Sequence, residues 1–186
     1  MKTILLCNQK GGVGKSLIAD ELAFSLERSG IPLDFYDLDA QGGTLHTTTK
    51  AEGAEVTVVD TPGALQEGMS DWVSAADLVV IPTRPTTRDM DPLLRMVDIV
   101  KAHKDKKVLY VVNGWNRYRA SRDFVQWFEG VADNDIVLKL PQSEKFVQSA
   151  AAGQSVVEYA PQTKAAKATQ ELIDKIRTMA GVGKEG

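Results

Sequence analysis

Cysteine is nearly absent from this sequence, with Cys7 the single example among 186 residues. An internal disulfide is therefore excluded, and so is an iron–sulfur cluster, which needs several thiolate ligands. Histidine is almost as scarce, and neither His46 nor His103 has partners at metal-ligand spacing, so we expect no histidine-based metal site. Cys7 itself stands in an apolar run, which favours the role of a small buried side chain.

Long hydrophobic runs are also missing. No stretch is apolar over the length that a membrane span requires, and the N-terminus lacks the pattern of a secretory signal peptide. Together with the single cysteine, this predicts a protein of the reducing cytoplasm. A content of 43% hydrophobic and 25% charged residues is typical of a soluble globular protein. We find no internal repeat and no linker, and predict one domain over residues 1–186.

The net charge of −3 is spread unevenly along the chain. Residues 1–100 contain 8 Lys and Arg against 15 Asp and Glu, whereas residues 101–186 contain 14 against 10. An acidic protein with a basic half can still present a local patch to a polyanion, so nucleic acid stays among the possible partners.

Short apolar runs alternate with stretches of helical spacing. The runs are near-continuous, as in parallel strands that helices cover on both faces, and comprise residues 4–7, 33–37, 56–60, 78–82, 108–113 and 136–141. Apolar residues recur at helical spacing within 17–26, 93–100, 124–131 and 172–179. This alternation predicts an α/β fold: a doubly wound, mostly parallel sheet flanked by helices, with sites at the carboxyl ends of its strands. The segment 41–55 is rich in Gly, Thr and Ala and reads as a loop.

A glycine-rich segment ending in Lys15 and Ser16 joins the first apolar run to the first helical stretch. In this context the pattern predicts a phosphate-binding loop, because glycines let backbone N–H groups curl round phosphate oxygens at a helix N-terminus. Lys15 would reach the β- and γ-phosphates, and the Ser16 hydroxyl would ligate Mg²⁺. The predicted nucleotide contacts of this corner are Gly11, Gly12, Val13, Gly14, Lys15, Ser16 and Leu17.

Three carboxylates stand at or just after the ends of predicted strands: Asp37, Asp39 and Asp60. Asp37 and Asp39 are spaced by one residue, so both can point to the same face and meet a metal–phosphate site. For an isolated Asp-x-Asp, a polar loop start is the alternative interpretation. The phosphate loop nearby favours the metal–phosphate site.

The phosphate loop departs from the general pattern, because its first glycine is missing and it contains an additional lysine, Lys10. In both respects it resembles the deviant loop of the ParA/MinD family of dimerising ATPases. The segment around Asp37 and Asp39 resembles the second motif of that family, with Ala40 in place of its proline. Residues 60–63 and 152–166 resemble its third motif and its C-terminal segment, so the likeness spans nearly the whole chain.

The resemblance implies a P-loop NTPase fold of the SIMIBI type, with ATP and Mg²⁺ as cofactors. It gives catalytic roles to Lys10, which would reach a partner protomer's nucleotide, to Lys15, and to Asp39, which would position the attacking water. It places Ser16, Asp37 and Asp60 at the metal. Gly63 would follow the γ-phosphate as a switch.

Two further strand ends belong to the predicted nucleotide site through the resemblance. Asn113 stands at the position that contacts adenine, although a strand-end turn former is an equally good interpretation. Pro141 stands where relatives continue with an arginine that this sequence lacks.

The likeness is strongest to small ParA-type partition proteins. It implies a homodimer formed on ATP, DNA binding without sequence preference, a ParB-like adaptor that stimulates hydrolysis, and no membrane partner. The protein would be cytoplasmic, and nucleoid-associated while ATP is bound. Candidate DNA contacts are Arg117, Arg119, Arg122, Lys164, Lys167 and Lys175, with Arg177 in the same C-terminal segment. A solvated charged surface is the alternative for these residues.

Two other functions remain open at this point. One is an ATP-dependent metabolic synthase on the same fold, of the dethiobiotin or cobyrinic acid amidating type. Lys10 and the C-terminal segment disfavour it, and so short a chain leaves little room for a substrate domain. The other is a MinD-like ATPase that cycles on membranes, for which residues 181–186 are too polar and glycine-rich to form an amphipathic anchor.

Overall fold

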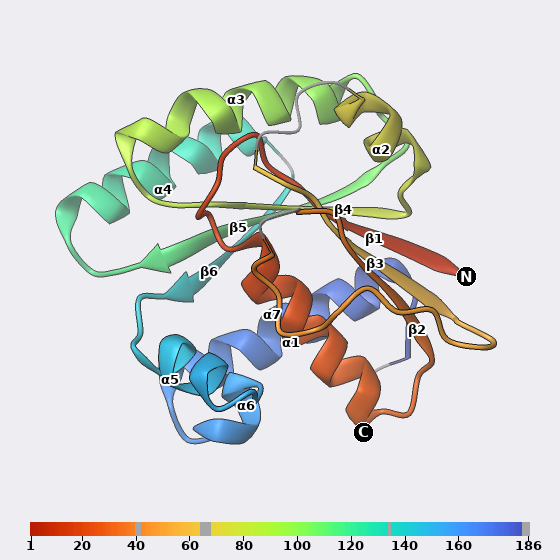
Figure 1. Cartoon of the computed structure of the whole chain (residues 1–186). Helices are drawn as coiled ribbons and strands as arrows, with labels where there is room; N and C mark the ends of the chain where they lie inside the picture. The colour runs from red at the N-terminus through yellow and green to blue at the C-terminus, as the bar shows by residue number, and fades with distance from the viewer. Residues whose placement is uncertain (40–41, 64–67, 134, 184–186) are drawn as a thin grey trace.

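The computed structural model describes residues 1–39, 42–63, 68–133 and 135–183. Its centre is a six-stranded sheet in the order β2-β3-β1-β4-β5-β6, and every strand pairing is parallel (Figure 1). The strands are β1 (Lys2–Leu6), β2 (Leu33–Asp37), β3 (Val56–Asp60), β4 (Leu78–Thr83), β5 (Lys107–Trp115) and β6 (Ile136–Pro141). The predicted fold class, an α/β P-loop architecture with a parallel sheet, is confirmed.

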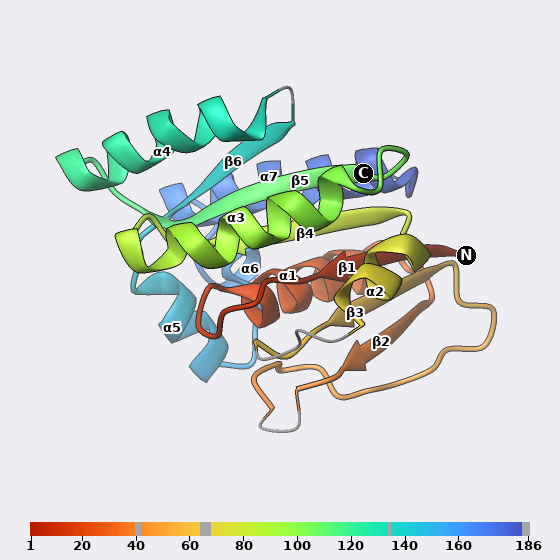
Figure 2. The ribbon, with the colours of Figure 1, turned by 90° about the horizontal axis from the view of Figure 1, so that it is seen from above.

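Helices cover both faces of this sheet (Figures 1 and 2). They are α1 (Lys15–Arg28), α2 (Met69–Ala75), α3 (Thr87–Lys101), α4 (Arg119–Ala132), α5 (Lys145–Ala151), α6 (Val156–Tyr159) and α7 (Lys164–Ala180). Helices α1, α5, α6 and α7 share one apolar cluster with the sheet, and α2, α3 and α4 share the other. No helix within the described ranges is long and apolar enough to cross a membrane.

Alternation along the strands explains the two clusters. Ile4 and Leu6 of β1 belong to the α1 side, whereas Leu5 belongs to the α3 side. Because successive side chains of a strand point to opposite faces, an uninterrupted apolar run is what a sheet covered on both faces requires.

The loop prediction holds where the structure describes it, since residues 42–55 contain no helix or named strand. This stretch touches the sheet through an isolated antiparallel bridge between Thr49 and Phe35. The short helices α2, α5 and α6 were not predicted. They comprise 7, 7 and 4 residues, fewer than an apolar period needs to become visible.

The topology brings the predicted site residues to one edge. The chain leaves β1 towards β2 and β3 on one side, then crosses to β4 on the other. In doubly wound sheets such a reversal creates a crevice at the carboxyl ends of the strands. Asp60 is in register with Leu6 on one side and with Asp37 on the other, so the loop after β1 lies beside both carboxylates.

Candidate nucleotide site at the carboxyl edge of the sheet

The phosphate loop depends on glycine at Gly12 and Gly14, which have φ angles of 71° and 105°. Gly14 caps the N-terminus of α1 in the left-handed region, and a Cβ there would lie 2.3 Å from the Asn113 amide nitrogen. A side chain at this position would be both strained and obstructed. The loop therefore keeps its backbone N–H groups open to an anion at the start of α1.

Lys15 is buried at this loop, with 6% of its surface exposed. Its ammonium donates to the Lys10 carbonyl oxygen at 3.1 Å. Burial lowers the pKa of Lys15, and the nearby charges of Asp60 and Asp39 oppose that effect. The partly desolvated cation would gain most from the arrival of a polyanion such as a triphosphate.

Ser16 and Asp60 are joined by a short hydrogen bond. The Ser16 hydroxyl donates to Asp60 Oδ2 at 2.6 Å, while Asp60 Oδ1 is buried without a hydrogen-bond partner among the described residues. Burial raises the pKa of Asp60 to about 6, against the opposing Ser16 hydrogen bond and Lys15 charge. A hydroxyl beside a carboxylate with an unmatched oxygen is a donor set that suits Mg²⁺.

The described residues contain no cluster of three or more His, Cys, Asp or Glu that could hold a metal ion by themselves. Beside nucleotides, Mg²⁺ is usually held by one or two protein ligands, phosphate oxygens and water. The Ser16 hydroxyl and the unpaired oxygen of Asp60 fit an ion that is held in this way.

Asp37 lies beside this pair at the end of β2, and its charge raises the pKa of Asp60. Its carboxylate accepts the Asp39 N–H at 2.9 Å and the Thr44 hydroxyl at 2.7 Å. Asp39 is half-buried, and its charge acts on Lys15. The structure thus brings Asp37, Asp39, Asp60 and Lys15 together, while Ala40 and Gln41 lie outside the described residues.

Gly63 lies directly against the phosphate loop. A Cβ at Gly63 would come within 2.5 Å of the Gly11 nitrogen and 2.7 Å of its Cα. Any other residue would push the two backbones apart. This close approach suits the switch role that the resemblance gives to Gly63.

Lys10 takes a different position from Lys15. Its ammonium forms an ion pair with Asp89 on α3 at 3.1 Å and donates to the Arg88 carbonyl oxygen at 3.0 Å. Asp89 is 2% exposed and also accepts the Thr86 hydroxyl just before α3. Asp89 is not among the predicted site residues, although Thr86 and Asp89 follow the spacing of a helix N-terminal capping box.

The remaining nucleotide candidates line the same edge. The Asn113 amide nitrogen donates to the Val13 carbonyl oxygen at 3.0 Å, so Asn113 braces the phosphate loop in addition to any contact with adenine. Leu17 is in the first turn of α1, packed against the apolar cluster. Pro141 ends β6, next to the Gln142 N–H that donates to the Trp115 carbonyl oxygen at 2.8 Å.

The candidate DNA contacts fall into two groups on different helices. Arg119 and Arg122 are exposed in the first turn of α4, and Arg117 is exposed just before it. On α7, Lys164 and Lys167 are exposed and Lys175 is half-buried. Helices α4 and α7 cover opposite faces of the sheet, so the two groups do not form one patch on a protomer (Figure 1).

Arg177 is not a surface residue, contrary to the sequence-based grouping. It is fully buried and bonds to Ser25 and Ser29 of α1 and its C-terminal end. At 100° per residue, position 177 lies on the side of α7 opposite to positions 164 and 175. It therefore joins α7 to α1.

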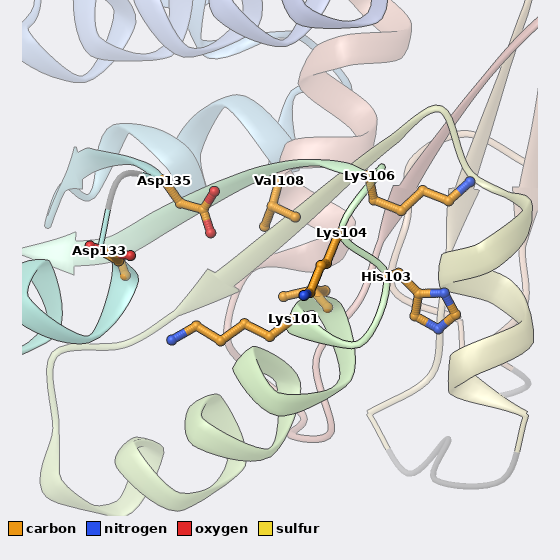
Figure 3. Close-up of a pocket in the computed structure, with 9 residues that line it drawn as sticks. Lys101, His103, Lys104, Lys106, Val108, Asp133 and Asp135 are labelled. Atoms are coloured by element: carbon orange, nitrogen blue, oxygen red, sulfur yellow. The ribbon is translucent and has the colours of Figure 1, made fainter.

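A hollow of about 470 Å³ lies at the opposite edge of the sheet from the candidate nucleotide site, around Lys101, His103, Lys104 and Lys106 (Figure 3). Two of its lysines have structural partners. Lys101 donates to the Val131 carbonyl oxygen near the end of α4, and Lys106 to that of Ser74 near the end of α2. Cations at helix C-termini neutralise the negative end of the helix dipole, so we assign these two lysines to helix capping.

Comparisons with known proteins agree with this geometry. Residues 4–156 match the family described as CobQ/CobB/MinD/ParA nucleotide binding domain. The protein ParA of Rhizobium radiobacter is 26% identical over 141 residues, which cover 60% of this chain and 63% of that protein. The chain thus spans less than two thirds of that relative's length.

Solved structures share the fold over nearly their whole length. An ATP complex of a variant of McdA from Cyanothece aligns with a TM-score of 0.76 at 15% identity, covering 99% of this chain and 98% of that one. The septum site-determining protein MinD from Pyrococcus horikoshii, complexed with Mg-ADP, aligns with a TM-score of 0.70 at 16% identity, covering 97% of both chains. This chain belongs to the CobQ/CobB/MinD/ParA family of nucleotide-binding domains, whose ParA and MinD members are P-loop ATPases.

Proposed function

We propose that this protein is a ParA-type ATPase that binds ATP with Mg²⁺, dimerises on the nucleotide and then binds DNA without sequence preference. A ParB-like adaptor stimulates hydrolysis, and the ADP-bound protein leaves the DNA. The cycle positions a cargo, which is a plasmid, a chromosome region or a protein assembly. The protein acts as one domain over residues 1–186, in the cytoplasm and on the nucleoid.

The observation that carries this proposal is the different placement of the two lysines in the phosphate loop. The Lys15 side chain is buried within the loop. The Lys10 side chain lies on the outer side of the loop, against α3, and is 31% exposed. One buried lysine is enough to bind the phosphates within a protomer. A second lysine at the exposed rim suits the nucleotide of a second protomer.

Hydrolysis needs little covalent chemistry from the protein. The loop N–H groups, Lys15 and the N-terminus of α1 bind and orient the phosphates. Asp39 orients a water molecule, whose oxygen attacks the γ-phosphorus. The bond from that phosphorus to the bridging oxygen breaks, its electron pair leaves with ADP, and the protons of the water stay on the released phosphate. Lys10 of the second protomer stabilises the charge that develops on the leaving group.

Mg²⁺ fits the Ser16 and Asp60 donor set. When bound, it neutralises charge on the β- and γ-phosphate oxygens. The Ser16 hydroxyl would hold it directly, and Asp60 and Asp37 would hold its water ligands. Asp60 must be ionised for this role.

An apolar hollow of about 680 Å³ supports the adaptor proposal. It lies between the N-terminal turns of α3 and α4 and is lined by Pro85, Thr86, Thr87, Met90, Ala120, Asp123, Phe124 and Trp127. Thr86 donates to Asp89, which pairs with Lys10. An apolar segment of the adaptor in this hollow would act on Lys10 through the start of α3.

DNA binding tests the proposal. A labelled duplex of arbitrary sequence should bind the protein with ATP and Mg²⁺, but not with ADP, and the affinity should fall steeply as salt rises because counterions are released. Changing Lys164, Lys167 and Lys175 to Glu should remove DNA binding while ATP-dependent dimerisation persists. If that variant still binds, the same exchange at Arg117, Arg119 and Arg122 tests the other group. A wild-type protein without salt-sensitive, ATP-dependent binding would contradict DNA-based positioning.

A further inference from the structure

The segment of residues 42–50 runs across α1 beside the nucleotide site (Figure 1). None of its residues belongs to either apolar cluster. Its side chains are exposed except those of Thr44 and His46, which are half-buried. Apart from the packing of His46 against two aromatic rings, the position of this segment therefore depends on polar contacts.

One end of the segment contacts the predicted metal residues. The Thr44 hydroxyl donates to Asp37 Oδ2 at 2.7 Å. At Gly43 the backbone approaches Ser16 so closely that a Cβ would lie 3.1 Å from the Ser16 hydroxyl oxygen. Movement of these two residues would change the surroundings of both Asp37 and Ser16.

The next two residues are held by Asp20 of α1, a carboxylate that is 5% exposed, and the far end of the segment is held by the backbone pair of Thr49 and Phe35. Asp20 accepts the Leu45 N–H at 2.9 Å and the His46 N–H at 3.1 Å. The imidazole Nδ1 of His46 lies 2.7 Å from the same carboxylate, and Nε2 lies 3.4 Å from Glu27. Both ring nitrogens thus face acidic side chains of α1.

Aromatic contacts fix the orientation of the imidazole. The Phe24 ring meets the His46 ring edge-on with centroids 4.5 Å apart, and the Phe35 ring lies 5.3 Å away. These two rings, from α1 and β2, leave His46 14% exposed. The sequence shows no metal-ligand partner for His46, and its contacts with α1 come from residues 19 and 26 positions away.

We propose that His46 and Asp20 form a clamp that positions Thr44 and Gly43, and through them Asp37 and Ser16, for Mg²⁺ and nucleotide. His46 acts through these neighbours, so it is a positioning residue. The expected effect of the clamp on Mg²⁺ and nucleotide binding rests on the proposed function of the site. The anchoring of the segment itself can be tested without nucleotide.

Protonation of His46 should tighten the clamp. Burial lowers the pKa of His46, but the hydrogen bond and charge of Asp20, with those of Glu27, outweigh burial and hold the pKa above its ordinary value. Among the described residues, Asp20 and Glu27 are the charged groups that act on the ring, and β2 contributes the uncharged Phe35. The charged clamp is complete below about pH 6.5 and is lost as pH rises through the higher folded pKa. The neutral ring keeps its Nδ1–H bond to Asp20.

Amide hydrogen exchange of Leu45 and His46 in the nucleotide-free protein tests the anchor directly. His46→Ala should reduce the protection of the segment about tenfold, the effect expected for a lost hydrogen bond to a charged group. His46→Asn retains a hydrogen-bond donor near the Nδ1 position and should keep most of the wild-type protection. Between pH 6.5 and 8.5, protection corrected for intrinsic rates should fall in the wild type and stay constant in His46→Asn. His103→Asn, far away beside Ser70, is the matched control.

Mg²⁺ titration of the ADP complex then tests the consequence. His46→Ala should weaken Mg²⁺ binding about fivefold, and His46→Asn less than about twofold, because the perturbation reaches the metal residues through Thr44 and Gly43. Unchanged protection in His46→Ala, or altered protection with unchanged Mg²⁺ affinity, would overturn the clamp. A wild type that binds no Mg²⁺-nucleotide would overturn the proposed site instead, and the exchange data would still decide the anchor.

Discussion

Replacing Asp60 with asparagine should stabilise the metal-free protein while abolishing its response to Mg²⁺ and nucleotide. Asp60 is 1% exposed, and burial raises its pKa from 3.8 to about 6. At 1.36 kcal/mol per pKa unit, holding the charged carboxylate in the fold costs about 3 kcal/mol. The asparagine would leave an unpaired amide near the position of Oδ1, which costs about 1 kcal/mol. The net gain is about 2 kcal/mol.

Thermal unfolding followed by circular dichroism measures this effect. At pH 8 with a chelator, the Asp60→Asn protein should melt about 4–8 °C above the wild type. Because the folded pKa is raised, the wild type takes up a proton on folding between about pH 4 and 6, and its charge penalty shrinks as pH falls. The difference in melting temperature between the variant and the wild type should therefore be, at pH 5, less than half of its value at pH 8.

Addition of Mg²⁺ and ATP should reverse the order of stability. Ligand binding raises the wild-type melting temperature by mass action, and the variant lacks the carboxylate that holds the metal's water ligands. If the variant melts below the wild type at every pH without metal, the ionised Asp60 carboxylate does not destabilise the metal-free fold, and the reasoning is refuted.

Other substitutions separate the steps of the cycle. Lys15→Ala should abolish ATP binding in equilibrium titrations, because the phosphates lose their direct cation; normal affinity would remove Lys15 from the site. Asp39→Ala should bind ATP and dimerise but hydrolyse at least about 100-fold more slowly, as adaptor-stimulated turnover would show; unchanged stimulated turnover would exclude its water-orienting role. Asp89→Asn should release Lys10 and tighten ATP-dependent dimerisation about threefold in sedimentation equilibrium, the size of a partly exposed ion pair; weaker dimerisation would mean that Asp89 supports Lys10 in the dimer.

Much of the fold and the placement of the site could be predicted because both depend on local patterns. Asp37 and Asp60 end apolar runs, and parallel strands place their carboxyl ends at one edge, so their proximity to Ser16 followed from order along the chain. The glycines of the loop are likewise tied to a local backbone conformation.

The side-chain partners of several charged residues could not be predicted, because these contacts join residues that are far apart in the sequence. The Lys10 contact with α3 spans 78 positions, and the His46 contact with Asp20 spans 26. The helical period of α7 places Arg177 on the inner side of the helix, but its partner Ser25 is 152 positions away along the chain. In each case a charged side chain has a specific partner that only tertiary packing brings near.

The most direct test of the central claim is ATP-dependent association that requires Lys10. Sedimentation velocity with Mg²⁺ and ATP should compare Asp39→Ala, in which slow hydrolysis preserves the ATP state, with the Lys10→Ala/Asp39→Ala double variant. We predict a dimer for the first and a monomer for the second, with ATP bound in both. A monomer in both, or a dimer that forms equally well without Lys10, would contradict the account.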